Sequence, residues 1–111
     1  MSIHRGAADQ VQPVFRALAD PTRRAIISML ADGPRAIADI AAEFDMTRPA
    51  VAKHLAILKE GGVVVAEAQG RERINRLNPD ALKTAADWLS HFDRFWDVRL
   101  AKLKEVVEKT S

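Results

Sequence analysis

The chain has 111 residues, a length that suits one domain, and 48% of them are hydrophobic, which is enough to build a core and argues against wholesale disorder. It has no cysteine, which excludes disulfides, thiolate metal sites and thiol redox switches. No apolar run approaches the roughly 20 residues that span a bilayer, and residues 1–11 carry no apolar signal-peptide core. We therefore expect a cytoplasmic protein with no membrane partner.

The net charge of +2 is small, but the positive excess is concentrated in one stretch. From Thr47 to Arg76 there are six Lys and Arg residues against three Glu residues, whereas the segments on either side are close to balanced. A basic patch on an otherwise balanced protein suggests a polyanionic partner. A merely solvated surface would give the same count, so charge alone leaves both interpretations open.

The first half of the chain is predicted to form four short helices, because its apolar residues recur at helical spacing between capping residues, prolines and glycines. The second helix begins with Asp20 as its cap and Pro21 as its first residue, and the fourth begins with Thr47 as its cap. Gly61 and Gly62 end the fourth helix. The four helices are expected at about 11–18, 21–32, 36–44 and 47–61.

The second half changes character after the paired glycines. Val63 to Val65 is β-branched, and residues 69–72 form a plausible hairpin turn before a return strand from Arg73 to Leu77. Apolar residues on the return strand do not alternate strictly, since Ile74 and Leu77 are three apart. Asn78 and Pro79 then open a last helix, which we expect to run without interruption over about 79–109.

This order of elements predicts a single winged helix-turn-helix domain spanning residues 1–111. The expected fold is mainly α, with five helices and a β-hairpin wing of two antiparallel strands. The helix-turn-helix lies at about 36–61, the wing at about 63–77 and a C-terminal dimerisation helix at about 79–109.

The fourth helix has the properties of a recognition helix, which needs an apolar inner face and a bare outer face that approaches the major groove. At ~100° per residue, Leu55 and Leu58 lie within about 40° of Val51, and the far side is small and basic at its N-terminal end. The helix N-terminus and the hairpin tip can also hold phosphates. The candidate DNA-binding residues are Thr47, Arg48, Pro49, Ala50, Lys53, His54, Arg71 and Arg73.

Three of the candidates, and two arginines outside the fourth helix and the wing, have particular expected roles. Thr47 caps the helix and donates its hydroxyl to a phosphate, and Lys53 reaches a phosphate or a guanine edge. His54 lies at the border of the buried face, so DNA contact and a packing role both remain open. Arg23 and Arg24 follow a helix cap and are either phosphate contacts or a plain surface pair.

The last helix carries an apolar stripe that is broader than a two-stranded seam requires. We infer burial on two sides, against its own domain and against a second copy of the chain. The first helix is expected to assist. The candidate dimer-interface residues are Val11, Val14, Phe15, Leu82, Leu89, Phe92, Trp96 and Leu103.

The segment from Val14 to Pro79 resembles the ArsR/SmtB group of bacterial winged-helix repressors, most specifically in ALADPTRRAIISML, TRPAVAKHLAILKEGG and the closing RLNP. The resemblance implies a homodimer packed through its first and last helices. Such a dimer binds double-stranded DNA at a palindromic operator near its own promoter and usually represses. It also implies that a small-molecule effector of unknown identity could control release.

Metal-sensing members of that group carry a cysteine pair in the third helix or an Asp/His/His/Glu set in the last one. Here the third helix has no cysteine, and the last has one histidine, His91, with Asp87 at i, i+4 as a conceivable zinc pair. We expect no metal site and no cofactor, which places the chain in the metal-independent branch. Trp88 and Trp96 are either core residues or the lining of an effector pocket.

Two other classes of function, an enzyme and a protein-binding module, fit the sequence less well. Nucleophilic catalysis needs a nucleophile beside a base, but Ser90 and His91 are adjacent and point about 100° apart on a helix. With no Gly-rich phosphate loop either, we do not expect an enzyme. A winged-helix module that binds only proteins is the second alternative, and the basic outer face argues against it.

Overall fold

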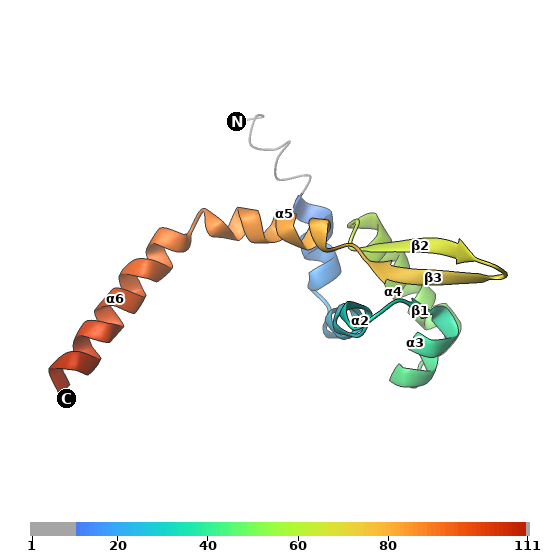
Figure 1. Cartoon of the computed structure of the whole chain (residues 1–111), viewed down its shortest axis with the longest axis horizontal. Coiled ribbons are helices and arrows are strands. Elements are labelled where there is room, and N and C mark those ends of the chain that lie inside the picture. Colours follow the sequence, from blue (N-terminus) through green and yellow to red (C-terminus); the bar gives the residue numbers. More distant parts are fainter. Residues whose placement is uncertain (1–10, 111) are drawn as a thin grey trace, which may run out of the picture.

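The computed structural model describes residues 11–110, so residues 1–10 and 111 of the predicted domain lie outside it (Figure 1). The described part contains six helical segments and three strands, against the five helices and two strands expected. In chain order they are a helix over residues 11–18, α2 (Pro21–Ala31), β1 (Arg35–Ala36), α3 (Ile37–Phe44), α4 (Arg48–Glu60), β2 (Val64–Gln69), β3 (Glu72–Leu77), α5 (Pro79–Ser90) and α6 (Asp93–Thr110).

Local capping explains where three of the helices begin. The Asp20 carboxylate accepts the Arg23 N–H at 3.0 Å, the Thr47 hydroxyl accepts the Ala50 N–H at 3.2 Å, and the Asn78 amide oxygen accepts the Asp80 N–H at 3.3 Å. A proline follows each cap within the first two helical positions, where its missing N–H is harmless. These predicted helix starts are therefore confirmed.

The core lies where the first four helices meet the wing and α5. Ile26, Ile40, Val51, Leu58 and Val63 are its largest fully enclosed side chains. They come from α2, α3, α4 and the start of the wing, so burial of one apolar face from each helix fixes how α3 and α4 are set relative to each other.

The wing is a three-stranded antiparallel sheet of order β1-β3-β2, which corrects the expected two-stranded hairpin. β1 is only two residues long, and its Arg35 and Ala36 pair with Asn75 and Ile74 of β3. Two residues are too few to show a strand period, which is why the sequence did not reveal this strand.

The broken alternation on the return strand also has a structural reason. Register pairs Asn75 with Ala66 and Arg73 with Ala68, so Arg73, Asn75 and Leu77 share the face that meets α4. Asn75 is buried on that face, 3% exposed, and its amide donates to the Arg35 carbonyl at 3.3 Å. A polar residue therefore occupies the position where an apolar one was expected.

The predicted C-terminal helix is divided into α5 and α6, which corrects the expectation of one continuous helix. Ser90 donates its hydroxyl to the Asp87 carbonyl, and the ring Nδ1 of His91 lies 3.0 Å from the Trp88 carbonyl. Side chains that bond the backbone in this way compete with helical bonding. After this break α6 runs away from the rest of the chain (Figure 1). Within residues 11–110 no helix is long and apolar enough to cross a membrane.

Candidate nucleic-acid interface

The N-terminal part of the outer surface of α4 is presented as the sequence predicted, whereas Ile57, further along, is half-buried against the core. Val51, Leu55 and Leu58 are buried, while Arg48 and Lys53 are exposed. Pro49 is also exposed and Ala50 is half-buried, so no bulky side chain stands between the helix backbone and a ligand. Thr47 uses its hydroxyl oxygen as the cap, which leaves the hydroxyl hydrogen available as a donor.

His54 lies apart from the other candidates on α4. Its ring is half-buried against the start of α2, with Nδ1 3.9 Å from the Asp20 carboxylate and 3.4 Å from the Arg23 guanidinium. The Arg23 backbone N–H lowers the pKa of Asp20, and the charges of Arg23 and His54 act in the same direction. Of the two roles left open for His54, this position favours packing.

Arg23 and Arg24 form hydrogen bonds with the C-terminal end of the first helix. The Arg23 guanidinium donates to the carbonyls of Ala17 at 3.0 Å and Arg16 at 2.8 Å, and Arg24 donates to the Leu18 carbonyl at 2.7 Å. These carbonyls belong to the last turn of the helix, where a cation is favourable. Both residues are thus committed to the fold and not free for a phosphate.

The wing presents its cations on two different faces. Gly70, at a positive φ of 64°, and Arg71 form the two-residue tip. Arg73 lies on the face that meets α4, whereas Arg76 lies on the opposite face and is paired with Glu67. The charge of Arg76, counted in the basic patch, is therefore neutralised within the chain.

The cations between residues 11 and 90 divide into two groups. Six of them donate to a carbonyl or pair with a carboxylate, namely Arg16, Arg23, Arg24, Arg35, Arg76 and Lys83. The other five have no hydrogen bond or ion pair within the described part of the chain, and all belong to α4 or the wing. We call them the α4–wing cations: Arg48, Lys53, Lys59, Arg71 and Arg73.

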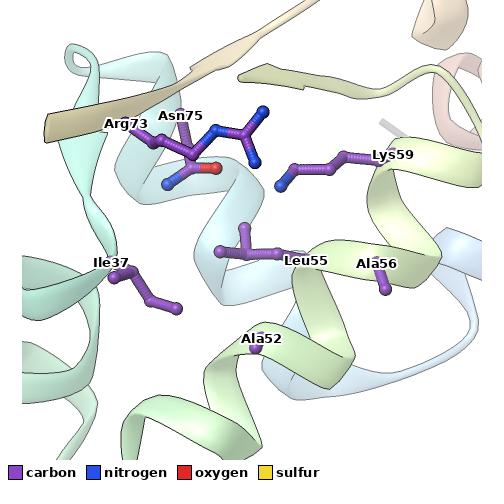
Figure 2. A pocket seen from close by; sticks show the side chains of 7 residues that line it. All are labelled: Ile37, Ala52, Leu55, Ala56, Lys59, Arg73 and Asn75. Carbon is purple, nitrogen blue, oxygen red and sulfur yellow. The ribbon is translucent and has the colours of Figure 1, made fainter. Parts of the chain in front are cut away.

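Lys59 was not among the candidate residues. It lies at the C-terminal end of α4 and lines a hollow of about 280 Å³ between α4 and β3, together with Arg73 (Figure 2). On a helical wheel Lys59 borders the apolar stripe, about 80° from Val51, so the sequence alone does not distinguish it from a solvated edge. The role of Lys59 becomes visible only when the wing is in place and brings Arg73 to the same hollow.

Comparison with known proteins shows the family of this fold. The sequence pattern described as bacterial regulatory protein, arsR family, matches residues 20–65, from the cap of α2 into β2. The HTH-type transcriptional regulator Rv2034 of Mycobacterium tuberculosis is 37% identical over 94 residues, which cover 85% of each of the two chains. The chain belongs to the arsR family.

Two further relatives bear on its function. The transcriptional repressor SdpR of Bacillus subtilis is 35% identical over 79 residues, covering 71% of this chain and 88% of SdpR. The homodimeric winged helix-turn-helix DNA-binding domain Mb0332 of Mycobacterium bovis has a TM-score of 0.67 at 32% identity, over 80% of this chain and 83% of that one. This arsR-family chain is thus a transcriptional regulator and not an enzyme, as its sequence led us to expect.

The residues considered for zinc are engaged with their own helix. The Asp87 carboxylate accepts from the Lys83 ammonium at 2.9 Å, and His91 lies against the Trp88 carbonyl. Within residues 11–110 no three His, Asp or Glu side chains are grouped closely enough to hold a metal ion.

The candidate dimer residues of this arsR-family chain fall into three groups. Leu89, Phe92, Trp96 and Leu103 are large apolar side chains with 41% to 63% of their surface exposed. Phe15 and Leu82 are half-buried, while Val11 and Val14 are buried within the single chain.

A run of aromatic rings joins the first helix to α6. The Phe15 and Trp88 ring centres are 5.6 Å apart, those of Trp88 and Phe92 5.1 Å, and those of Phe92 and Phe95 6.3 Å. These rings form a continuous apolar surface that, within the described part of the chain, is left exposed on its outer side.

Proposed function

We propose that this regulator is a homodimer that binds double-stranded DNA at an inverted-repeat operator and represses transcription from it, including at its own promoter. The observation that carries the proposal is the division of the cations. Every Lys and Arg between residues 11 and 90 that lies outside α4 and the wing has an internal partner, whereas five on α4 and the wing have none. Cations without internal partners on a basic surface attract a polyanion.

The geometry of α4 suits the major groove, which is about 12 Å wide and admits an α-helix. The Thr47 hydroxyl and the free N–H groups of the first turn would hold a phosphate, since they carry donors and the positive end of the helix dipole. Lys53, one turn further along, would reach a base edge. Arg71 at the wing tip would contact the backbone or the adjacent minor groove.

Dimerisation would bury the apolar surface of α5 and α6. Leu89, Phe92, Trp96 and Leu103 would lie in the interface, with Phe15 and Leu82 at its edge. Because Val11 and Val14 are covered by their own chain, they would hold the first helix in place beneath the interface. A two-fold dimer places its recognition helices about one DNA turn apart, or a multiple of it, which requires an inverted repeat.

Control by an organic effector fits the same surface. A hollow of about 290 Å³ is lined by Phe92, Phe95, Trp96 and Arg99, and an effector bound there would reach the dimer interface. Since the chain lacks cysteine, we expect operator binding to be insensitive to arsenite and soft metals. EDTA should likewise leave the affinity unchanged.

Footprinting on DNA from the region upstream of the protein's own gene tests the proposal. We expect two protected half-sites in inverted orientation, centred about 10 bp or a multiple of it apart. A single asymmetric half-site would contradict the dimeric mode of binding. Failure to protect any genomic fragment would favour the alternative, a winged-helix module that binds only proteins.

A further inference from the structure

The hollow between α4 and the wing is bordered by two of the α4–wing cations. Small side chains, Ala52 and Ala56, leave space on the α4 side, and Lys59 extends from α4 while Arg73 extends from β3. Figure 2 shows the charged ends of Lys59 and Arg73 pointing toward one another across this space. Two like charges are thus directed into one hollow about 280 Å³ in volume.

No carboxylate of the described chain compensates these two charges. Glu60, next to Lys59, pairs with Arg16 at 3.0 Å, and Glu67 pairs with Arg76. Glu72, next to Arg73, lies on the opposite face of β3, because successive residues of a strand point to opposite faces. Like charges repel, and their convergence becomes favourable only when an anion lies between them. The arrangement therefore fits a bound anion better than it fits an empty surface.

The proposed function, on which this step rests, supplies such an anion. If α4 occupies a major groove and the wing reaches the adjacent minor groove, one sugar-phosphate strand must pass between them, because a single strand separates two neighbouring grooves. The hollow lies between α4 and β3, where that strand would pass. Larger side chains at Ala52 and Ala56 would obstruct it.

We propose that Lys59 and Arg73 together bind one backbone phosphate of the strand that passes between α4 and the wing. Lys59 is then a residue that positions the protein on DNA without reading its sequence. Ala52 and Ala56 allow the strand to approach. A free phosphate has the same chemistry, and the experiment below separates the two sources.

The test uses fluorescence anisotropy to compare the full-length wild type with Lys59→Ala, Arg73→Ala and the double variant, each on operator and on scrambled DNA. Each single variant should bind both DNAs more weakly by a similar factor, roughly tenfold for each of the two charge-assisted contacts that the dimer loses. The double variant should lose less than the product of the two single losses, because both cations serve one phosphate. If the affinity loss of the double variant equals the product of the two single losses, the two cations do not share a phosphate.

A second variant tests the shape of the hollow. Ala56→Leu should weaken DNA binding without lowering the thermal unfolding midpoint, whereas Ala31→Leu, at an exposed position at the end of α2, should leave binding unchanged. Lys83→Ala is the matched control for charge, since Lys83 is paired with Asp87. If Lys59→Ala and Ala56→Leu bind like the wild type while Lys53→Ala binds weakly, this inference fails and the proposed function stands.

Inorganic phosphate distinguishes the source of the anion. At constant ionic strength, phosphate should displace DNA no better than chloride does. If micromolar phosphate releases DNA from the wild type but not from Lys59→Ala, the hollow binds a free phosphate, and the proposed contact with a DNA phosphate is wrong. A wild type that binds no DNA would overturn this inference together with the proposed function.

Discussion

Between residues 11 and 90, some cationic side chains are used within the fold and others are left for a partner. Arg23 and Arg24 close the end of the first helix, so a pair that looked available from sequence is used internally. The charge of Arg76 is paired with that of Glu67. Lys53 and Arg71 keep their charges unpaired within the described part of the chain. The net charge of +2 therefore understates the charge that a polyanion would meet.

Replacing Lys53 and replacing Arg71 by alanine should have different kinds of effect on DNA binding. Lys53→Ala should cost about 1–3 kcal/mol of operator binding and relax the preference at one position of each half-site, as expected for a base contact. Arg71→Ala should weaken all DNA sequences alike, because a backbone contact carries no sequence information. Binding to operator and to single-base variants at about 150 mM salt measures both. If both variants keep wild-type affinity, the assigned surface is wrong.

Asp20 should make stability depend on pH at the acidic end. The Arg23 N–H lowers the pKa of Asp20 in the folded protein. Its stabilising contribution is therefore complete above the unfolded pKa of about 3.9 and is lost as the pH falls through the lower folded value. Asp20→Asn keeps a capping oxygen but has no charge. Urea unfolding should show the wild type more stable than Asp20→Asn near neutrality, with the difference shrinking below about pH 4. A difference that stays constant with pH would contradict this.

At the scale of elements, the geometry of the helix-turn-helix depends on how α3 and α4 end. At the end of α4 the Val63 N–H bonds the Leu58 carbonyl at 2.9 Å and the Gly62 N–H bonds the Lys59 carbonyl at 2.9 Å, with Gly62 at a φ of 71°. This is the Schellman pattern. α3 ends with the same pattern, but its left-handed residue is Asp45, at a φ of 51°.

Replacing Asp45 by glycine should stabilise the protein. A left-handed backbone costs a residue with a side chain on the order of 1 kcal/mol, although Asp tolerates it better than most, and glycine removes this strain. We expect Asp45→Gly to raise the free energy of unfolding by up to about 1 kcal/mol, partly offset by the greater freedom of glycine in the unfolded chain. Gly62→Ala is the matched opposite and should destabilise. Urea denaturation measures both, and a destabilised Asp45→Gly variant would show that the aspartate side chain matters more than the strain.

Elements defined by local signals were predictable, and elements defined by distant contacts were not. A cap such as Thr47 acts within three residues, so the helix starts could be read from sequence. β1 exists only because Arg35 and Ala36 meet β3, some forty residues further along the chain. The break at His91 interrupts a seven-residue apolar repeat that continues on both sides, so the pattern indicated one helix. Lys59 was missed because its role also depends on a distant contact, since Arg73, which lines the same hollow, is on the wing.

At the scale of the whole molecule, the extents are 62 × 43 × 21 Å, with α6 at one end of the longest dimension and the tip of the wing at the other (Figure 1). Large apolar side chains are exposed along α5 and α6, including Trp96 at 63% and Leu103 at 60%. Exposed apolar surface of this extent marks an interface, and a small helical domain gains stability by covering it.

Sedimentation should therefore find a dimer at micromolar concentration and not the 12.3 kDa monomer. Trp96→Glu places a charge in the proposed interface and should shift the protein toward the monomer. Val65→Glu is the control, because Val65 is a large apolar residue that is 42% exposed but lies on the wing. A wild type that sediments as a monomer, or equal effects of the two substitutions, would contradict the assigned interface.

The salt dependence of operator affinity tests most directly whether the α4–wing cations bind DNA. For B-DNA the slope of log K against log salt concentration is about −0.9 for each phosphate neutralised. The wild-type dimer should show a steep negative slope. Arg71→Ala should make the slope shallower by about twice 0.9, because the dimer loses two phosphate contacts. Lys59→Ala and Arg73→Ala should each change it by less, because the two cations share one phosphate. Lys83→Ala should leave the slope unchanged, since its charge is already paired. A shallow wild-type slope, or a slope unaffected by removing the α4–wing cations, would contradict the account.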